Sequence, residues 1–200
     1  MNKIFGFWHI ANAGARNNWQ LIYPSQWKAL HASGLYAATD KLHVTLANST
    51  PPEVPVEIGG TSLICDDPKV VMACYALREV YEFPALGWLR TLADGTEPFY
   101  AYYIHVKGAS TADHENKNPA YWWKEYMEHY VVTRWRDCVA RLDAGFDTCG
   151  VEWRDLPAPH YSGNFWWATS AYLKKLPPMA GYQAENPHDQ IGRASCRERV

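Results

Sequence analysis

The sequence lacks several features that would point directly to a function. No apolar run approaches the ~20 residues that a membrane-spanning helix needs. Lys and Arg together number 19 against 21 Asp and Glu, the formal net charge is −2, and the basic residues are scattered. A protein that binds a nucleic-acid polymer needs a basic face. The sequence therefore predicts neither a transmembrane segment nor a nucleic-acid partner.

Motifs of several common enzyme classes are also missing. There is no Walker phosphate-binding loop, no Gly-x-Gly-x-x-Gly, no Gly-x-Ser-x-Gly and no His-Glu-x-x-His. These absences argue against an ATPase, a dinucleotide-dependent oxidoreductase, a serine hydrolase of the usual α/β kind and a zincin. The sequence has no Cys-x-x-Cys spacing, so we expect reduced thiols at Cys65, Cys74, Cys138 and Cys149.

The two ends of the sequence each have two interpretations. Residues 191–200 resemble the translation of a sequencing-adapter read, and the alternative is an ordinary basic tail. We therefore expect one domain over residues 1–190, truncated at its C-terminus, followed by ten residues that are not native. The apolar run Ile4–Ile10 imitates a secretion signal, but it is short and contains Gly6 and His9. We expect a buried first strand there, and hence a cytoplasmic protein.

Strand-like and helix-like segments alternate along the rest of the chain. We expect strands at 4–10, 42–47, 54–58, 70–75, 99–106, 148–153 and 161–167. Helices are expected after Asn18, with a kink at Pro24, at 84–93, in two segments between 119 and 145, and at 171–176. This alternation predicts an α/β fold in which helices flank a mostly parallel central sheet, with residues 99–106 at its centre.

Aromatic residues are abundant, with ten Trp and thirteen Tyr, and one segment combines them with an amide. Phe165, Trp166 and Trp167 follow Asn164. Flat apolar rings beside a group that both donates and accepts hydrogen bonds suit a sugar. Aromatic residues in a strand are, however, more often core. Strand alternation places Trp166 and Trp167 on opposite faces, so only one of them is expected to contact a sugar.

Charged residues follow two of the expected strands. His105 and Lys107 are two residues apart and share a face, and Gly108 allows a ligand close to the backbone. Such a cationic pair suits a phosphate or diphosphate, although an exposed lysine and a packed histidine would look the same. Asp66 and Asp67 fit either a metal site or a turn with a side-chain cap, and we favour the turn.

The order of short motifs resembles that of GT-A-type glycosyltransferases from bacterial surface-polysaccharide loci and large viruses, including the rhamnan-synthesis group. The motifs are Phe-x-His-Ile at 7–10, Tyr-Glu-Phe-Pro at 81–84, Ile-His-x-Lys-Gly at 104–108, His-Tyr-Ser-Gly-Asn-Phe-Trp-Trp at 160–167 and Ala-Glu at 184–185. The resemblance implies a Rossmann-like GT-A fold, a nucleotide-diphosphate sugar as donor and a glycan as acceptor.

The resemblance also implies roles for individual residues. Glu185 matches the general base of inverting enzymes. The implied donor-binding residues are His9, His105, Lys107 and Gly108, and the implied acceptor-binding residues are His160, Ser162, Gly163, Asn164, Trp166 and Trp167. Many members place an Asp-x-Asp metal motif where this sequence has His105 and Lys107. We therefore assign no metal ligands and leave the cofactor open, with divalent Mn or Mg as candidates, because cationic side chains can neutralise the leaving diphosphate themselves.

Two other kinds of protein would account for the same residues. One is a non-catalytic carbohydrate-binding or degenerate transferase-like domain, which the aromatic residues and the missing Asp-x-Asp favour. The other is a structural partner domain in which Trp122, Trp166 and Trp167 anchor an interface.

Overall fold

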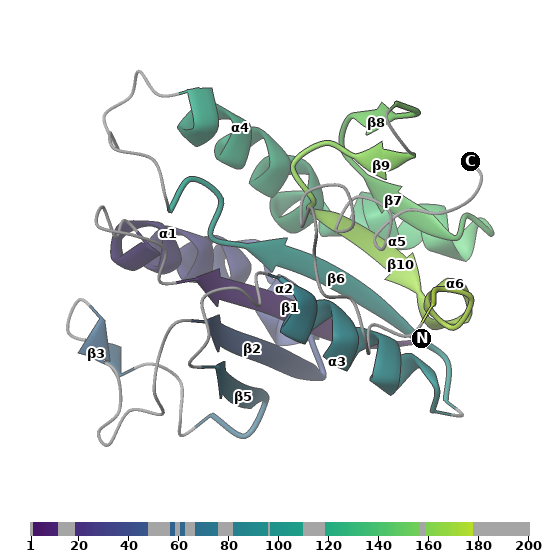
Figure 1. Ribbon diagram of the computed structural model, residues 1–200, viewed down its shortest axis with the longest axis horizontal. Coiled ribbons are helices and arrows are strands. Elements are labelled where there is room, and N and C mark those ends of the chain that lie inside the picture. Colours follow the sequence, from purple (N-terminus) through teal and green to yellow (C-terminus); the bar gives the residue numbers. More distant parts are fainter. Residues whose placement is uncertain are drawn as a thin grey trace.

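A six-stranded sheet runs through the centre of the molecule (Figure 1), with strand order β5-β2-β1-β6-β10-β7. The computed structural model describes residues 2–11, 19–47, 57–58, 61–62, 67–75, 82–95, 97–109, 119–156 and 159–177. The sheet strands are β1 (Lys3–Ala11), β2 (Lys41–Ala47), β5 (Val70–Tyr75), β6 (Phe99–His105), β7 (Thr148–Gly150) and β10 (Trp166–Thr169).

Most neighbouring strands of this sheet run in the same direction. β1 pairs in parallel with β2 and β6, and β2 pairs in parallel with β5. β10 is inserted antiparallel between β6 and β7. The prediction of a mixed α/β fold with a mostly parallel central sheet is confirmed, and 99–106 forms an interior strand of that sheet.

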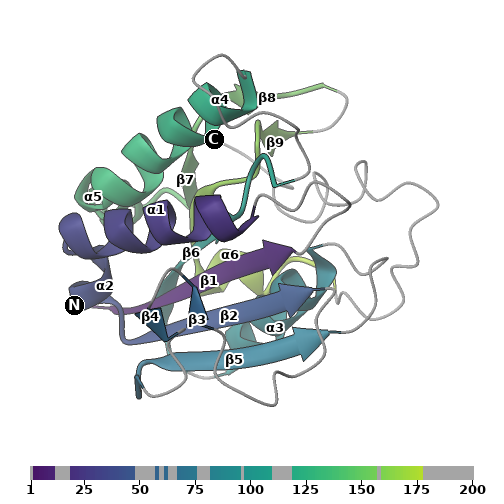
Figure 2. The ribbon, with the colours of Figure 1, turned by 90° about the vertical axis from the view of Figure 1, so that its left-hand side faces the viewer.

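Helices cover both faces of the sheet, giving three layers (Figure 2). One face packs against α1 (Trp19–Ala32), α4 (Pro119–Glu128), a π-helical turn η2 (His129–Thr133) and α5 (Trp135–Asp143), with the short α2 (Leu35–Ala38) following α1. The other face packs against α3 (Phe83–Ala93) and α6 (Ser170–Leu173). Two small pairs, β3 (Glu57–Ile58) with β4 (Thr61–Ser62) and β8 (Trp153–Arg154) with β9 (His160–Tyr161), lie outside the main sheet.

Both faces of β1 are buried, which explains its nearly continuous apolar sequence. Ile4, Trp8 and Ile10 belong to the core on the α1 side, whereas Phe7 belongs to the core on the α3 side. Gly6 interrupts the apolar run because a Cβ there would overlap the ring of Tyr102 on β6. The signal-like N-terminal segment is therefore a central strand in this structure.

The predicted boundaries hold in several places and fail at turns. β5 matches 70–75, and the helix predicted at 84–93 is α3. Pro24 does not break α1, which continues through it to Ala32. The strand predicted at 161–167 is divided into β9 and β10, because Gly163 and Asn164 both have positive φ, 82° and 62°. The strand predicted at 148–153 is divided into β7 and β8 at Glu152, which has φ 53°.

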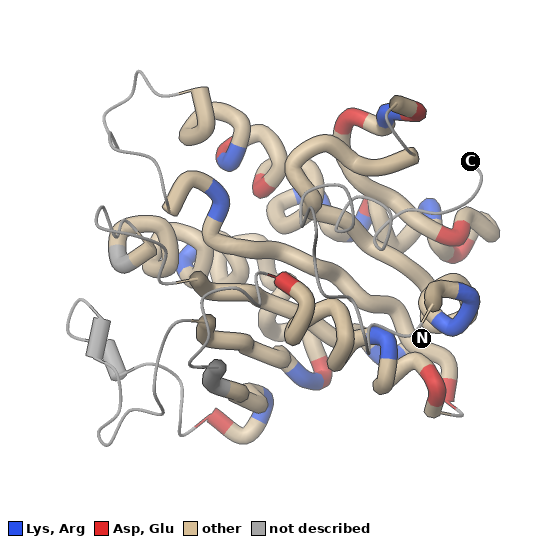
Figure 3. The backbone as a smooth tube through the Cα atoms, viewed as in Figure 1, with Lys and Arg blue, Asp and Glu red and all other residues tan. Residues whose placement is uncertain are grey.

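Charged residues of both signs are distributed around the described backbone (Figure 3).

The strand predicted at 54–58 is described only as Glu57–Ile58, and residues 178–200 lie outside the described part. None of the helices in the described ranges is long and apolar enough to cross a membrane.

Candidate functional site

The candidate site lies where the order of strands in the sheet changes direction. The chain passes from β1 to β2 and β5 on one side, and then to β6 on the other side of β1. In α/β sheets, ligands bind outside the carboxyl ends of the strands at such a switch point. His9 and His105 are paired in register near the carboxyl ends of β1 and β6. Their strand positions alternate with those of the α1-side core, so both lie on the α3 face.

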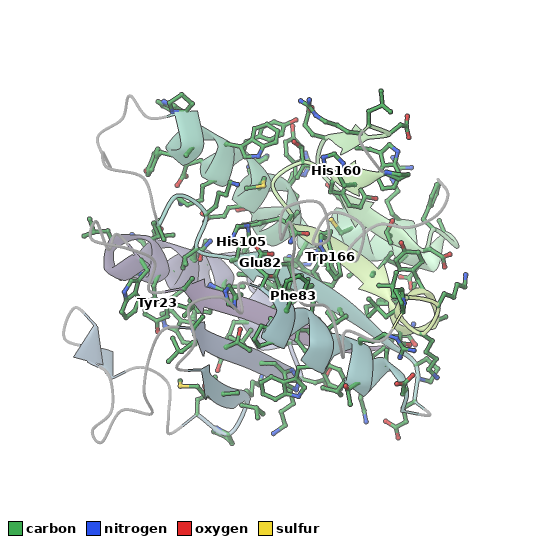
Figure 4. All side chains as sticks on the ribbon, in the orientation of Figure 1. Tyr23, Glu82, Phe83, His105, His160 and Trp166 are labelled. Carbon is green, nitrogen blue, oxygen red and sulfur yellow. The ribbon has the colours of Figure 1, made fainter. Side chains whose placement is uncertain are left out.

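Glu82, directly before α3, brings a carboxylate to this pair of histidines. Its Oε2 accepts a 2.8 Å hydrogen bond from the hydroxyl of Tyr103 and another from the side-chain amide of Asn164. Its Oε1 lies 3.6 Å from Nδ1 of His105. Figure 4 labels Glu82, His105 and Trp166 near the centre of the molecule. Three separate elements, α3, β6 and the turn before β10, therefore meet at one carboxylate.

The ring of His105 is held on both sides. Its Nε2 donates to the backbone carbonyl of Gly163 at 3.0 Å, so this nitrogen carries a proton and Nδ1 faces Glu82. Its own backbone carbonyl accepts a 2.9 Å hydrogen bond from Gln26 of α1. The side-chain oxygen of Gln26 in turn accepts a 2.9 Å hydrogen bond from the indole of Trp8. The end of β6 is therefore fixed from both layers of helices.

The turn at Gly163 and Asn164 completes the site and depends on glycine. A Cβ at Gly163 would overlap the sulfur of Met127 and the indole nitrogen of Trp123, and its φ of +82° is itself unfavourable for other residues. Asn164 donates to Glu82 and accepts a 2.8 Å hydrogen bond from the indole of Trp166. The sequence Gly-Asn-x-Trp thus docks this turn against both α4 and the carboxylate.

Burial and neighbouring charges set the protonation of these groups. Burial by itself raises the pKa of Glu82, but His105, His9, Tyr103 and Asn164 together outweigh it and hold the pKa below its usual range. Burial lowers the pKa of His9 to about 4. Burial also lowers the pKa of His105, against the opposing effect of Glu82. At neutral pH the site therefore holds an ionised carboxylate beside two neutral imidazoles.

This arrangement has a definite chemical capacity. His9 Nδ1 lies 2.9 Å from the hydroxyl of Thr45, so its ring is also anchored. Neutral His105 with a proton on Nε2 leaves Nδ1 as an unprotonated nitrogen beside the Glu82 carboxylate. The pair can take up one proton when negative charge arrives nearby, and the resulting imidazolium would be stabilised by Glu82.

The predicted donor-binding residues come together at this end of the sheet. Val106 follows β6 and its N–H donates to the carbonyl of His9 at 3.1 Å. Lys107 and Gly108 form the turn after it, and Gly108 has φ 87°. The charge of Lys107 acts on His105, lowering the pKa of that imidazole. His9, His105, Lys107 and Gly108 are thus neighbours, as the sequence spacing led us to expect for the last three.

The predicted acceptor-binding residues are divided between two regions. Gly163 and Asn164 belong to the site described above. His160 lies in β9, apart from Glu82 and His105 (Figure 4), and the N–H of Ser162 donates to the carbonyl of Glu152 at 3.0 Å.

Trp166 and Trp167 are core residues of opposite faces. Their exposed fractions are 1% and 0%. Trp166 stacks on Tyr103 with ring centroids 5.4 Å apart, and Trp167 donates to the carbonyl of Val131 at 2.9 Å. The predicted alternation between the two faces is confirmed. Neither indole offers a face to a sugar in this conformation.

The candidate acidic residues are placed only in part. Glu185 and Asp66 lie outside the described residues. Asp67 accepts a 2.8 Å hydrogen bond from the N–H of Lys69 and another from the hydroxyl of Tyr36, which is the turn role that we favoured. Within the described ranges, no group of three or more His, Cys, Asp and Glu side chains is placed to hold a metal ion.

Two features of the site escaped sequence reasoning. Glu82 received no role, although it belongs to the Tyr-Glu-Phe-Pro motif and lies directly before α3. The second feature is a row of exposed aromatic side chains on α4 and η2, at the helical spacing i, i+4, i+8, of which sequence reasoning had singled out only Trp122, as an interface anchor. Its members are Trp122, Tyr126 and Tyr130, with exposed fractions of 58%, 40% and 42%. Trp123 links this row to the site, because it stacks on Tyr126 and lies against Gly163.

The fold and the site define an α/β protein with a polar, partly buried site at the switch point of its sheet. The chain belongs to a family that is described as a domain of unknown function, DUF8361, which matches residues 80–197 and hence more than half of the chain. The matched region includes Glu82, His105 and the Gly163 turn. No curated protein and no solved structure matches the chain.

Proposed function

We propose that this chain is a GT-A-like glycosyltransferase domain that binds a nucleotide-diphosphate sugar at the switch point between β1 and β6. The observation that carries the proposal is the pairing of His9 with His105 near the carboxyl ends of these strands, followed by the Lys107-Gly108 turn. This edge is where α/β sheets bind ligands, and a lysine beside a glycine suits a diphosphate.

Within this site, Lys107 and His105 have different roles. Lys107 supplies the positive charge for the diphosphate. Both ring nitrogens of His105 face protein atoms, Glu82 and Gly163, so His105 positions the Gly163 turn and adds charge only after taking up a proton. The described residues offer no cluster of metal ligands, so we assign the neutralisation of the leaving diphosphate to these side chains.

The transfer itself needs a base for the acceptor hydroxyl. We assign this role to Glu185 on the basis of the family resemblance. Glu82 is unsuited to it, because Tyr103 and Asn164 already donate hydrogen bonds to its carboxylate and its pKa is lowered. One base that deprotonates the hydroxyl during in-line attack at the anomeric carbon gives inversion.

The glycan acceptor is expected on the exposed aromatic row of α4. Trp122, Tyr126 and Tyr130 are exposed aromatic side chains, and Trp123, which stacks on Tyr126, connects them to the Gly163 turn. Trp166 and Trp167 support the turn from the core. We also propose a cytoplasmic location, because the segment Ile4–Ile10, which imitates a secretion signal, forms part of the central strand β1.

A non-catalytic carbohydrate-binding domain is the second candidate. It is favoured by one observation, that the polar groups around Glu82 are already paired with one another. Such saturation is expected of a structural network as well as of a preorganised site.

The deciding experiment is a panel of nucleotide-diphosphate sugars, tested for turnover with the full-length protein, with and without divalent metal. Turnover with any donor supports the transferase, whereas glycan binding without turnover selects the second candidate. Glu185→Gln should lose roughly 10²–10⁴-fold in rate while still binding donor. Near-normal turnover in this variant would remove Glu185 as the base and direct the search to Asp189, Asp66 and Asp67.

A further inference from the structure

Two cysteines that the sequence places in no motif meet at the edge of the sheet. Cys138 lies on the buried side of α5, and Cys149 is the central residue of β7. Cys138 belongs to the core, and Cys149 is partly exposed and packs against the same cluster. The two side chains interact with each other, and the S–H of Cys138 donates to the carbonyl of Tyr130 at 3.6 Å. Both are free thiols in this structure.

Cys149 lines an open pocket, whereas Cys138 is buried. This pocket has a volume of about 170 Å³, and Cys149 lines it together with Arg141, Phe146, Thr148 and Tyr161. The guanidinium of Arg141 lies over the ring of Phe146, 5.8 Å from its centroid. The hydroxyls of Thr148 and Tyr161 lie 3.0 Å apart. A volume of several water molecules admits a small oxidant, and the pocket leads it to Cys149 rather than to Cys138.

The surroundings divide the two sulfurs into a nucleophile and a thiol donor. The interaction with Cys138 and the charge of Arg141 lower the pKa of Cys149, and they outweigh the opposing effects of burial and Asp137. The pKa of Cys138 is raised by its interaction with Cys149, by burial and by the charge of Asp137. Asp147 also lines the pocket, but Lys175 lies 3.1 Å from its carboxylate and offsets its charge. Thiolate character is what makes a cysteine reactive toward oxidants.

We propose that Cys149 is a modification site for hydroperoxides and that Cys138 resolves the product into a Cys138–Cys149 disulfide. In the first step the Cys149 thiolate attacks the terminal peroxide oxygen. The O–O bond breaks, hydroxide or an alkoxide leaves, and Cys149 becomes a sulfenic acid. In the second step Cys138 loses its proton and attacks the Cys149 sulfur, and the S–OH group leaves as water. One peroxide is reduced and the two thiols are oxidised by two electrons in total.

This site is independent of the sugar site at the switch point. It lies on β7 and α5, whereas the switch-point residues lie on β1, β6 and the start of α3. A disulfide here would tie α5 covalently to the edge strand of the sheet.

The test is treatment of the folded full chain with hydrogen peroxide, followed by alkylation and peptide mapping. The expected product is a Cys138–Cys149 cross-linked peptide that dithiothreitol reverses. In Cys138→Ser and Cys138→Ala, dimedone should trap a sulfenic acid at Cys149, and in Cys149→Ser the cross-link should be absent and Cys138 should stay reduced. Arg141→Ala should slow the oxidation several-fold, whereas the exposed control Arg154→Ala should not.

Circular dichroism of each variant verifies that it is folded. Two substitutions are made at Cys138 so that the test remains possible if one of the two variants does not fold. The proposal is overturned if folded wild-type protein forms no Cys138–Cys149 bridge. It is also overturned if peroxide oxidises Cys65, Cys74 or Cys196 before Cys149, or if Cys138 in Cys149→Ser forms a sulfenic acid as fast as Cys149 does in wild type.

Discussion

Oε1 of Glu82 lies 3.6 Å from Nδ1 of His105, and both side chains are largely buried. The carboxylate arrives from the start of α3 and the imidazole from the end of β6, and the Gly163 turn is bonded to both through its carbonyl and through Asn164. The geometry of the switch point therefore depends on this one pair. Variants of the pair and of its supports test how far the site is built by its own polar contacts.

Glu82→Gln is expected to destabilise the fold by about 1–3 kcal/mol at pH 7, because Tyr103 and Asn164 would then donate to a neutral amide oxygen, and hydrogen bonds to a charged carboxylate are the stronger ones. The lowered pKa of Glu82 contributes stability above the unfolded value near 4.5, and this contribution is lost as pH falls through the folded pKa. The deficit of the variant should therefore shrink in acid. Urea unfolding at pH 7 and in acid measures it. Glu97→Gln, at an exposed ion pair with Lys3, is the control and should change little.

Gly163→Ala and Gly145→Ala form a matched pair, since both glycines have positive φ, +82° and +96°. A Cβ at Gly145 meets nothing within 4 Å, whereas one at Gly163 overlaps Met127 and Trp123. Both variants should lose about 1 kcal/mol to backbone strain, and Gly163→Ala a further 1–3 kcal/mol to overpacking. Denaturant unfolding compares them. Equal losses would show that α4 yields to the new methyl group and that the turn is not locked.

His43→Phe should flatten the stability of the protein between pH 6.5 and pH 4. Burial lowers the pKa of His43 to about 4, and its Nδ1 is buried with no hydrogen-bond partner in the described part of the chain. The unfolded chain therefore binds a proton that the folded one refuses, and stability falls by up to about 3 kcal/mol as pH drops through this window.

Phenylalanine keeps the stacking of residue 43 on Phe7, whose ring centroid is 4.6 Å away, and cannot be protonated. Thermal unfolding at several pH values gives the slope of stability against pH for wild type and for His43→Phe. The exposed His129→Phe is the control. Parallel slopes in His43→Phe and wild type would show that His43 does not contribute to the acid sensitivity.

Lys107→Ala should weaken the binding of nucleoside diphosphates by roughly 1.5–3 kcal/mol, the usual worth of a hydrogen bond to a charged group. Isothermal titration calorimetry measures the affinity, and Lys174→Ala at an exposed position after α6 controls for net charge. His105→Ala should weaken binding as well, with a loss of stability because Glu82 and Gly163 lose their partner. Unchanged affinity in both variants would separate this turn from the donor site.

Trp167→Ala should lower the stability of the fold, whereas Trp122→Ala should leave stability almost unchanged. Removing the buried indole of Trp167 is expected to reduce the free energy of unfolding by about 3–5 kcal/mol. Removing the exposed indole of Trp122 should change it by less than about 0.5 kcal/mol. If glycans bind along α4, only Trp122→Ala should weaken glycan binding while the protein stays fully folded. Normal glycan binding by Trp122→Ala would argue against the aromatic row as the acceptor surface.

Local patterns in the chain were sufficient for much of the architecture. The apolar runs at 4–10, 42–47, 70–75 and 99–106 form the four parallel strands. For the interior strands β1, β2 and β6 the reason is burial on both faces, which requires a continuous apolar sequence, whereas β5 is the edge strand and is partly exposed. The N-cap of α6 at Thr169, which accepts from the N–H of Tyr172 at 3.1 Å, also depends on short-range chemistry. The spacing of His105, Lys107 and Gly108 correctly indicated a polar strand end.

Contacts between distant residues decided the rest. Glu82 is 23 residues before His105 and 82 before Asn164, and Cys138 meets Cys149 only because α5 packs on β7. The aromatic run at 165–167 was ambiguous in the sequence, since an indole that stacks on a sugar and one that fills a core have the same composition. Which of these it does depends on what covers it, and α4, η2 and α3, brought in from elsewhere in the chain, bury both Trp166 and Trp167.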